Sequence, residues 1–200
     1  MRITESTLRQ LIRKVLLREV RITPDSLPGD ITLQLRVSST GGNITLQVMR
    51  GHDFVGTLEA NRVRGEENPC WGAYEVGLSK SEIDGLGPLM YDIVMEIATE
   101  LGGGLISDRY AVSAAARGVW QKYQDSRPDV ERLQLDSPEN EITPTRKDNC
   151  NVKVSKIYSG SKELPVWRDY PLSGAYRKPG METIRKLVRM KKLQVDGMDI

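Results

Sequence analysis

The sequence predicts an α+β domain with a mixed, mostly antiparallel sheet, and three features of its pattern lead to this prediction. Four segments with apolar residues at alternate positions come first, and a period of two is typical of half-buried strands. A turn rich in glycine follows. Two segments with helical periodicity and a short apolar segment between them then complete the central part. Strands followed by alternating helices and strands favour one sheet with central helices.

The four strand-like segments are predicted to form an antiparallel meander. Gly41-Gly-Asn43 has the composition of a tight turn between the first two segments. Polar loops separate the later ones. The expected strands cover residues 31–37, 44–49, 54–58 and 71–78.

The central helices are predicted from periodicity and from their end signals. Pro88 suits a first helical position, because its missing N–H would have no partner within the helix. Gly102-Gly-Gly104 is typical of a helix end. A short strand is expected over 105–107, and a second helix over 113–124 with Ser113 as its N-cap. The buried face of the first helix is predicted to carry Leu89, Ile93, Val94, Ile97 and Ala98.

Three regions are expected along the chain. Residues 1–22 form an amphipathic helical arm, with apolar side chains at the spacing of one helical face. Residues 30–160 form the main domain, which includes a long polar loop over 127–151. Residues 161–200 form a C-terminal extension that ends near a basic helix over 181–190.

Composition excludes several classes of protein. The chain of 200 residues has 29 basic and 27 acidic side chains, so its formal charge of +2 gives no argument for a nucleic-acid partner. No apolar run approaches the roughly 20 residues that span a bilayer. Two cysteines 80 positions apart, Cys70 and Cys150, and one histidine, His52, predict neither a disulfide framework nor a metal site. The default expectation is a cytoplasmic protein.

The segment from the glycine turn to the second helix carries the chemical signal. Gly85 and Gly87 would let the backbone approach an anion at a helix N-terminus. Glu82-Ile-Asp-Gly-Leu-Gly87 and Ser113-Ala-Ala-Ala-Arg-Gly-Val-Trp120 resemble the two motifs of the GNAT superfamily of N-acetyltransferases, and the segment between them is similar to the central helix of that family.

This resemblance implies a GNAT-like fold and acyl transfer from acetyl-CoA to an amine. It implies Glu75 as the base that deprotonates the amine, and Tyr123 as the nearest replacement for the tyrosine acid of the family. Asp108 and Arg109 are the implied substrate-binding residues. The implied cofactor-binding residues are Val76, Gly77, Leu78, Glu82, Gly85, Leu86, Gly87, Ser113 and Trp120.

The chain departs from the family pattern at three places. Glu82 and Asp84 put carboxylates where the pyrophosphate would bind, and like charges disfavour binding. Trp120 stands where the family carries its tyrosine, and an indole is no useful general acid. No helix pair separates the first two predicted strands. With these departures, the alternative is that the protein is an inactive relative of the family.

A second resemblance concerns proteins of tailed bacteriophages. The opening residues 1–14 are similar to the start of many tailed-phage proteins. Residues 85–92, Asp108-Arg109, Trp120 and the tail 175–180 resemble GNAT-like phage proteins. The alternative function is therefore a virion structural or interaction protein on this scaffold, located in the host cytoplasm or the virion, with its terminal helices docking on a partner or a second copy. A cysteine hydrolase that uses Cys150 and His52 is a further alternative, which no local motif supports.

Overall fold

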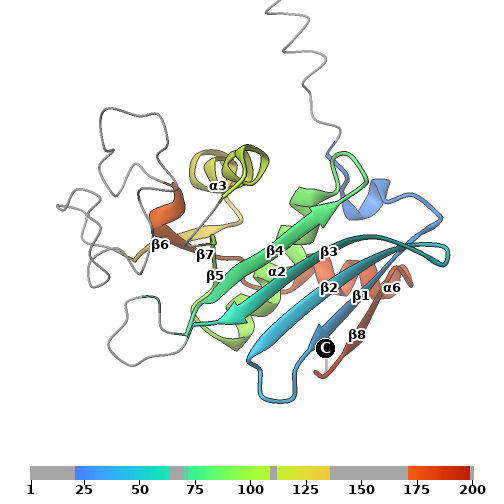
Figure 1. The fold of residues 1–200 in the computed structure, drawn as a ribbon, viewed down its shortest axis with the longest axis horizontal. Coiled ribbons are helices and arrows are strands. Elements are labelled where there is room, and N and C mark those ends of the chain that lie inside the picture. The colour runs from blue at the N-terminus through green and yellow to red at the C-terminus, as the bar shows by residue number, and fades with distance from the viewer. Residues whose placement is uncertain (1–20, 64–69, 71, 109–111, 136–170, 199–200) are drawn as a thin grey trace, which may run out of the picture.

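The computed structural model describes residues 21–63, 70, 72–108, 112–135 and 171–198. These residues form an eight-stranded mixed sheet and three α-helices, so the α+β prediction is confirmed (Figure 1). The strand order is β6-β7-β5-β4-β3-β2-β1-β8. The predicted arm over 1–22 lies outside the described residues, except for its last two positions.

The predicted antiparallel meander is confirmed in the first four strands. Each strand pairs with the next one along the chain, and β1 pairs with β2 from Ile31↔Arg50 to Val37↔Ile44. The hairpin between them explains the absence of a helix pair at this point. The four strands are β1 (Ile31–Val37), β2 (Asn43–Arg50), β3 (Asp53–Arg62) and β4 (Tyr74–Ser81).

The remaining strands extend the sheet on both sides. β5 (Leu105–Ile106) pairs with β4 in parallel, and β7 (Gly174–Arg177) pairs antiparallel with β5. β8 (Leu193–Asp196) lies parallel to β1 at the opposite edge. Residues 171–198 therefore supply strands to both halves of the sheet.

One strand falls where the sequence predicts a loop. β6 (Glu131–Gln134) pairs with β7, although the polar stretch 127–151 was expected to be irregular. β6 is an outer strand whose one apolar residue, Leu133, is exposed, so it carries no alternating pattern. The strand expected over 152–158 lies outside the described residues.

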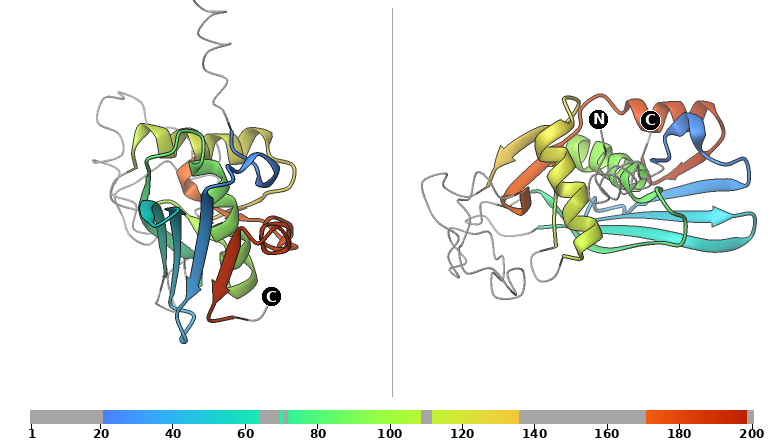
Figure 2. Two further views of the ribbon diagram at one scale, coloured as in Figure 1. Left: turned by 90° about the vertical axis from the view of Figure 1, so that its right-hand side faces the viewer. Right: turned by 90° about the horizontal axis from the view of Figure 1, so that it is seen from above.

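The helices begin where the sequence signals place them. α2 (Gly87–Leu101) has Pro88 in its first turn, and α3 (Ala114–Ser126) has Ser113 as N-cap, whose Oγ accepts from the Ala116 N–H at 3.2 Å. α6 (Glu182–Arg189) follows β7. Figure 2 shows α2 and α6 on the same side of β1–β3.

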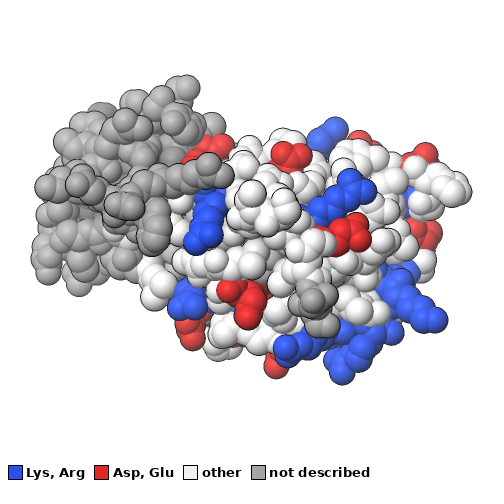
Figure 3. Space-filling view, turned by 90° about the horizontal axis from the view of Figure 1, so that it is seen from below, with Lys and Arg blue, Asp and Glu red and all other residues white. Residues whose placement is uncertain are grey.

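The core lies between the sheet and these helices. The inward side chains of β1 and β2 are buried at alternate positions, while α2 is buried along nearly its whole length, from Leu89 to Thr99. The apolar face of α6 is also inside, because Ile184 and Leu187 are fully buried. Its last turn carries the basic residues Lys186 and Arg189. Figure 3 shows that Lys and Arg side chains gather at one end of the molecule.

α2 carries a polar stripe through this core. Asp92, Glu96 and Thr99 are all buried and lie on one helical face. Thr99 Oγ1 accepts from the Lys178 N–H at 2.8 Å, and Lys178 Nζ lies 2.9 Å from Glu96 Oε1. The stripe therefore connects the central helix to the C-terminal part of the chain.

Two further findings concern the exclusions made from composition. Cys70 is buried and disulfide-bonded, whereas the sequence predicts no disulfide framework; the wide spacing from Cys150 gives no signal for pairing. Among the described helices, none is both long enough and apolar enough to cross a membrane.

Candidate functional site

The parallel strands β4 and β5 separate after a very short pairing. Their register consists of Tyr74↔Leu105 and Glu75↔Ile106, and β4 then continues to Ser81 without β5. At this point β4 also has a bulge, because Val76 pairs with Ala60 and Leu78 with Glu59, which leaves Gly77 without a partner in the register. Bulges bend a strand and redirect its backbone groups. The bulge thus lies where the sheet opens.

A pocket of about 150 Å³ fills this gap. Strand β4 forms one wall, the start of α3 forms another, and α2 and the segment after β5 close it. Six residues that the sequence predicts for the site are among those that line it. The lining residues are Val76, Gly77, Leu78, Ser79, Tyr91, Asp108, Val112, Ser113, Ala116 and Trp120.

Two aromatic side chains lie deep in this pocket. Trp120 is 1% exposed and meets the ring of Tyr91 edge-on, with ring centroids 5.3 Å apart and planes at 85°. Burial raises the pKa of Tyr91; a hydrogen bond with Ser79 lowers it, and the negative charge of Asp108 raises it. The phenol of Tyr91 is therefore protonated at neutral pH.

The glycine turn leads into α2, whose Tyr91 lines this pocket, but none of the predicted turn residues is among the lining. Gly85 has φ 78°, a conformation that glycine tolerates. Leu86 is fully buried, so its side chain belongs to the core and only its backbone faces the turn. The first intrahelical bond runs from Met90 N–H to Leu86 O, which places the Gly87 N–H among the helix-start amides that have no intrahelical acceptor.

Glu82, before this turn, is exposed and lies 3.7 Å from Lys80 Nζ. The pair is open to solvent, so the charge of Glu82 is screened. A Cβ added at Gly87 would meet no atom within 4 Å, which leaves space next to the start of the helix.

The other predicted site residues lie elsewhere. Glu75 is half-buried, and successive side chains of a strand alternate, so it projects to the face opposite Val76 and does not line the pocket. Tyr123 is buried away from the gap, and its hydroxyl donates to Asp92 Oδ1 at 2.8 Å. Burial raises the pKa of Tyr123 well above 10.0, and the Asp92 carboxylate raises it further. Arg109 lies outside the described residues.

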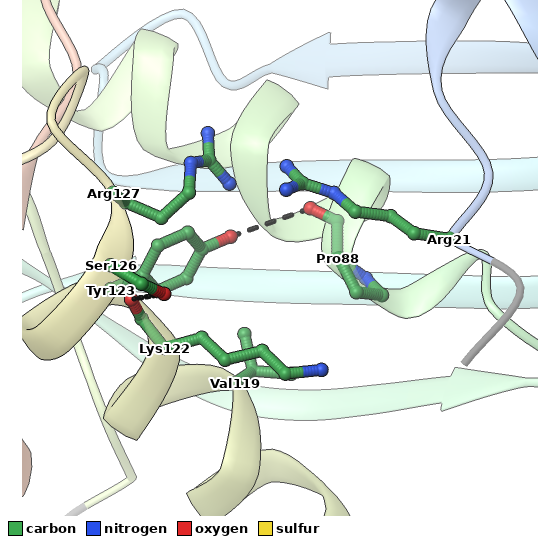
Figure 4. A pocket seen from close by; sticks show the side chains of 7 residues that line it. All are labelled: Arg21, Pro88, Val119, Lys122, Tyr123, Ser126 and Arg127. Carbon is green, nitrogen blue, oxygen red and sulfur yellow. Dashed lines mark hydrogen bonds between the residues drawn. The ribbon is translucent and has the colours of Figure 1, made fainter. Parts of the chain in front are cut away.

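A second pocket, of about 110 Å³, lies between the start of α2 and the second half of α3. Figure 4 shows the guanidinium groups of Arg21 and Arg127 approaching each other from opposite sides above the Tyr123 hydroxyl. The complete lining is Arg21, Pro88, Val119, Lys122, Tyr123, Ser126 and Arg127.

The two arginines of this pocket are bound to carboxylates. Arg127 donates to both oxygens of Asp92 at 3.0 Å and to Asp129 at 2.7 and 2.6 Å, while Arg21 lies 3.2 Å from Asp92. Burial alone would lower the pKa of Arg127, but the hydrogen bonds to Asp129 and Asp92 raise it above its usual value. Arg127 thus stays charged and fixed in place.

Sequence reasoning did not identify Tyr91, Ser79 or Ala116 as site residues. Tyr91 lies one turn after Pro88, within a helix whose apolar residues predict only packing. The isolated Gly77 inside a strand was a usable signal for the bulge.

No protein-family model matches the chain, and no curated protein matches it.

Proposed function

We propose that this protein is an N-acyltransferase of the GNAT type, which transfers an acyl group from acetyl-CoA to an amine. The observation that carries the proposal is the gap between β4 and β5. It opens at the bulged Gly77 and contains a pocket lined by six residues that the resemblance implies for acyl-CoA or substrate binding.

The order of elements supports the same proposal. An antiparallel meander precedes the glycine turn, α2 connects the parallel strands β4 and β5, and α3 follows β5. The neighbours of β5 on its other side are β7 and then β6. Fold alone does not determine function, so the proposal depends on the pocket.

The chemistry of a pantetheine chain fits the open edge of β4. Beyond Glu75 no strand of the described residues pairs with β4 on the β5 side. The backbone N–H and C=O groups of Val76 to Ser79 that point to this side can therefore pair with the amides of an extended ligand. A backbone N–H near the bulge would polarise the thioester carbonyl, as oxyanion-hole donors do. The glycine turn and the Gly87 N–H would receive the pyrophosphate, with Lys122 in the adjacent pocket.

The amine would reach the thioester from the face of the sheet opposite to the Val76 side chain. Glu75 projects to this face and remains our candidate for the base that takes a proton from the incoming ammonium group, directly or through water. Asp108, which lines the pocket at the end of β5, is the candidate for orienting the amine.

Calorimetric titration with acetyl-CoA tests the proposal. We expect micromolar binding, about −8 kcal/mol. Ala116→Trp would place an indole in the pocket and lower the affinity at least tenfold, whereas Ala115→Trp, on the exposed side of the same helix, would leave it unchanged. Absence of binding at millimolar acetyl-CoA, or equal binding by both variants, would overturn the proposed site.

A further inference from the structure

Acyl transfer from a thioester is assisted by a proton donor for the departing sulfur. Trp120 stands where the family carries this donor, and Tyr123 is the replacement that the resemblance implies. The indole N–H of Trp120 cannot protonate a thiolate. The structure nevertheless provides tyrosine hydroxyls around this indole, because the rings of Tyr91 and Tyr123 both contact it, with centroids at 5.3 and 6.0 Å. The two tyrosines differ in where their hydroxyl groups lie.

Tyr123 has its proton engaged in a buried ion cluster. Its hydroxyl donates to Asp92, and loss of that proton would put a phenolate next to a carboxylate inside the protein. Tyr123 lines the second pocket and not the gap between β4 and β5.

Tyr91 lies inside the gap. It lines the pocket opposite the open edge of β4, and its side chain interacts with Ser79 of that strand. Its hydroxyl is paired with a neutral hydroxyl of the pocket wall and not, like that of Tyr123, with the buried Asp92 carboxylate, so a ligand in the pocket can compete for the Tyr91 proton. The edge-on contact with Trp120 fixes the orientation of the phenol.

We propose that Tyr91 is the catalytic acid of the acyl transfer, and that Trp120 is a positioning residue that holds it. This inference rests on the proposed function. The amine nitrogen attacks the thioester carbonyl and a C–N bond forms. When the C–S bond breaks, its electron pair goes to sulfur and the Tyr91 proton follows. The nitrogen loses two protons through the base, one from the incoming ammonium group and one after the C–N bond forms. One of them reprotonates Tyr91 by way of solvent and the other is released, so the products are an amide, CoA thiol and one proton.

Thiol release from acetyl-CoA, measured with a panel of amines and with water alone, tests the assignment alongside calorimetry. Tyr91→Phe should lower kcat by about 10²–10⁴-fold, the usual contribution of general acid–base catalysis, with an unchanged Kd for acetyl-CoA. Tyr176→Phe is the matched control. This tyrosine belongs to the same aromatic cluster, its hydroxyl donates to Pro171 O at 2.7 Å, and it does not line the pocket.

The outcomes separate the two proposals. Normal binding and turnover by Tyr91→Phe would overturn the role of Tyr91 and leave acyl transfer intact. A selective loss of kcat in Tyr123→Phe would move the acid to that residue. Wild-type protein that neither binds acetyl-CoA nor releases thiol, or that binds without release, would overturn acyl transfer and the acid with it. If Tyr91→Phe fails to fold, Trp120→Phe provides the second test, since loosened positioning should lower kcat by a larger factor than the loss of a pocket-lining indole raises Kd. Equal changes in kcat and Kd would overturn the positioning role.

Discussion

The buried carboxylate of Glu96 offers the sharpest test of how the fold is held together. α6 begins after Met181, which has a left-handed backbone (φ 52°) and makes no side-chain cap bond. The cap is supplied by Glu96 of α2, whose two oxygens accept from the N–H groups of Thr183 and Ile184 at 3.0 and 2.9 Å. Glu96 Oε1 also lies 2.9 Å from Lys178 Nζ.

Glu96→Gln keeps the shape of the side chain and removes half of its acceptors. One amide N–H of α6 would then face an NH₂ group, and an unsatisfied buried donor costs about 1–3 kcal/mol. The charge-assisted bond to Lys178 contributes a further ~1.5–3 kcal/mol. Asp92 Oδ2, 3.6 Å from Lys178 Nζ, retains part of the pairing. We therefore expect a loss of about 3–5 kcal/mol, near the range for breaking a buried pair.

Urea unfolding followed by far-UV circular dichroism measures this loss. With a slope of roughly 2 kcal/mol/M, the midpoint should fall by roughly 2 M. Glu100→Gln, on the exposed end of the same helix, is the matched control and should change stability by less than ~0.5 kcal/mol. If Glu96→Gln shifts the urea midpoint no more than that control does, Glu96 does not cap α6 in the way we infer. In a double-mutant cycle with Lys178→Met, the two losses should be far from additive.

Three other changes have defined expectations. Gly104→Ala should lower the free energy of unfolding in urea by at least ~2 kcal/mol, because Gly104 has φ 92° and a Cβ would lie 2.5 Å from a β7 carbonyl oxygen. The control Gly51→Ala, with φ 59° and open space around the Cβ, should lower it by about 1 kcal/mol. The folded state raises the pKa of Tyr123, so the contribution of its neutral form to the free energy of unfolding is complete below pH 10.0 and is lost as the pH rises further. Tyr123→Phe should therefore flatten the dependence of stability on pH above about pH 10. Hydrogen bonding to Arg127 lowers the pKa of Asp129, so the Asp129 carboxylate contributes to the free energy of unfolding above pH 3.8, and this contribution is lost as the pH falls below it. Asp129→Asn should reduce the loss of stability in acid by less than ~1 kcal/mol, because the side chain is half exposed.

The sequence predicted those parts of the fold whose signals are local. β1 matches its expected range of 31–37, because seven alternating residues bury one face. Ser113 caps α3 through its own hydroxyl, three residues from its partner. The cap of α6 could not be predicted, since Glu96 and Thr183 are 87 positions apart and only the packing of α2 against α6 brings them together. β6 was missed because a four-residue edge strand needs no apolar alternation.

The sequence predicted some residues of the candidate site and missed others. Trp120 was named from a short motif and Gly77 from the strand that precedes the glycine turn, and both line the pocket. Tyr91 was not named, because a tyrosine on a helix buried nearly all round predicts packing. Its position in the pocket depends on where the bulge separates β4 from β5, which is a long-range property of the sheet.

Charge balance explains why the proposal depends on the β4 backbone and not on the arginines. Asp92, Glu96 and Asp129 carry three negative charges, and Arg21, Arg127 and Lys178 carry three positive charges, so this connected cluster is neutral overall. Neutrality makes its burial tolerable and leaves little positive charge for a phosphate. Glu82 is likewise screened by solvent. Affinity for acetyl-CoA should therefore come mainly from backbone hydrogen bonds and pocket packing, and should weaken only slightly between low and moderate salt. A steep salt dependence would instead assign the binding energy to ion pairs with phosphate and count against the β4 edge as the principal contact.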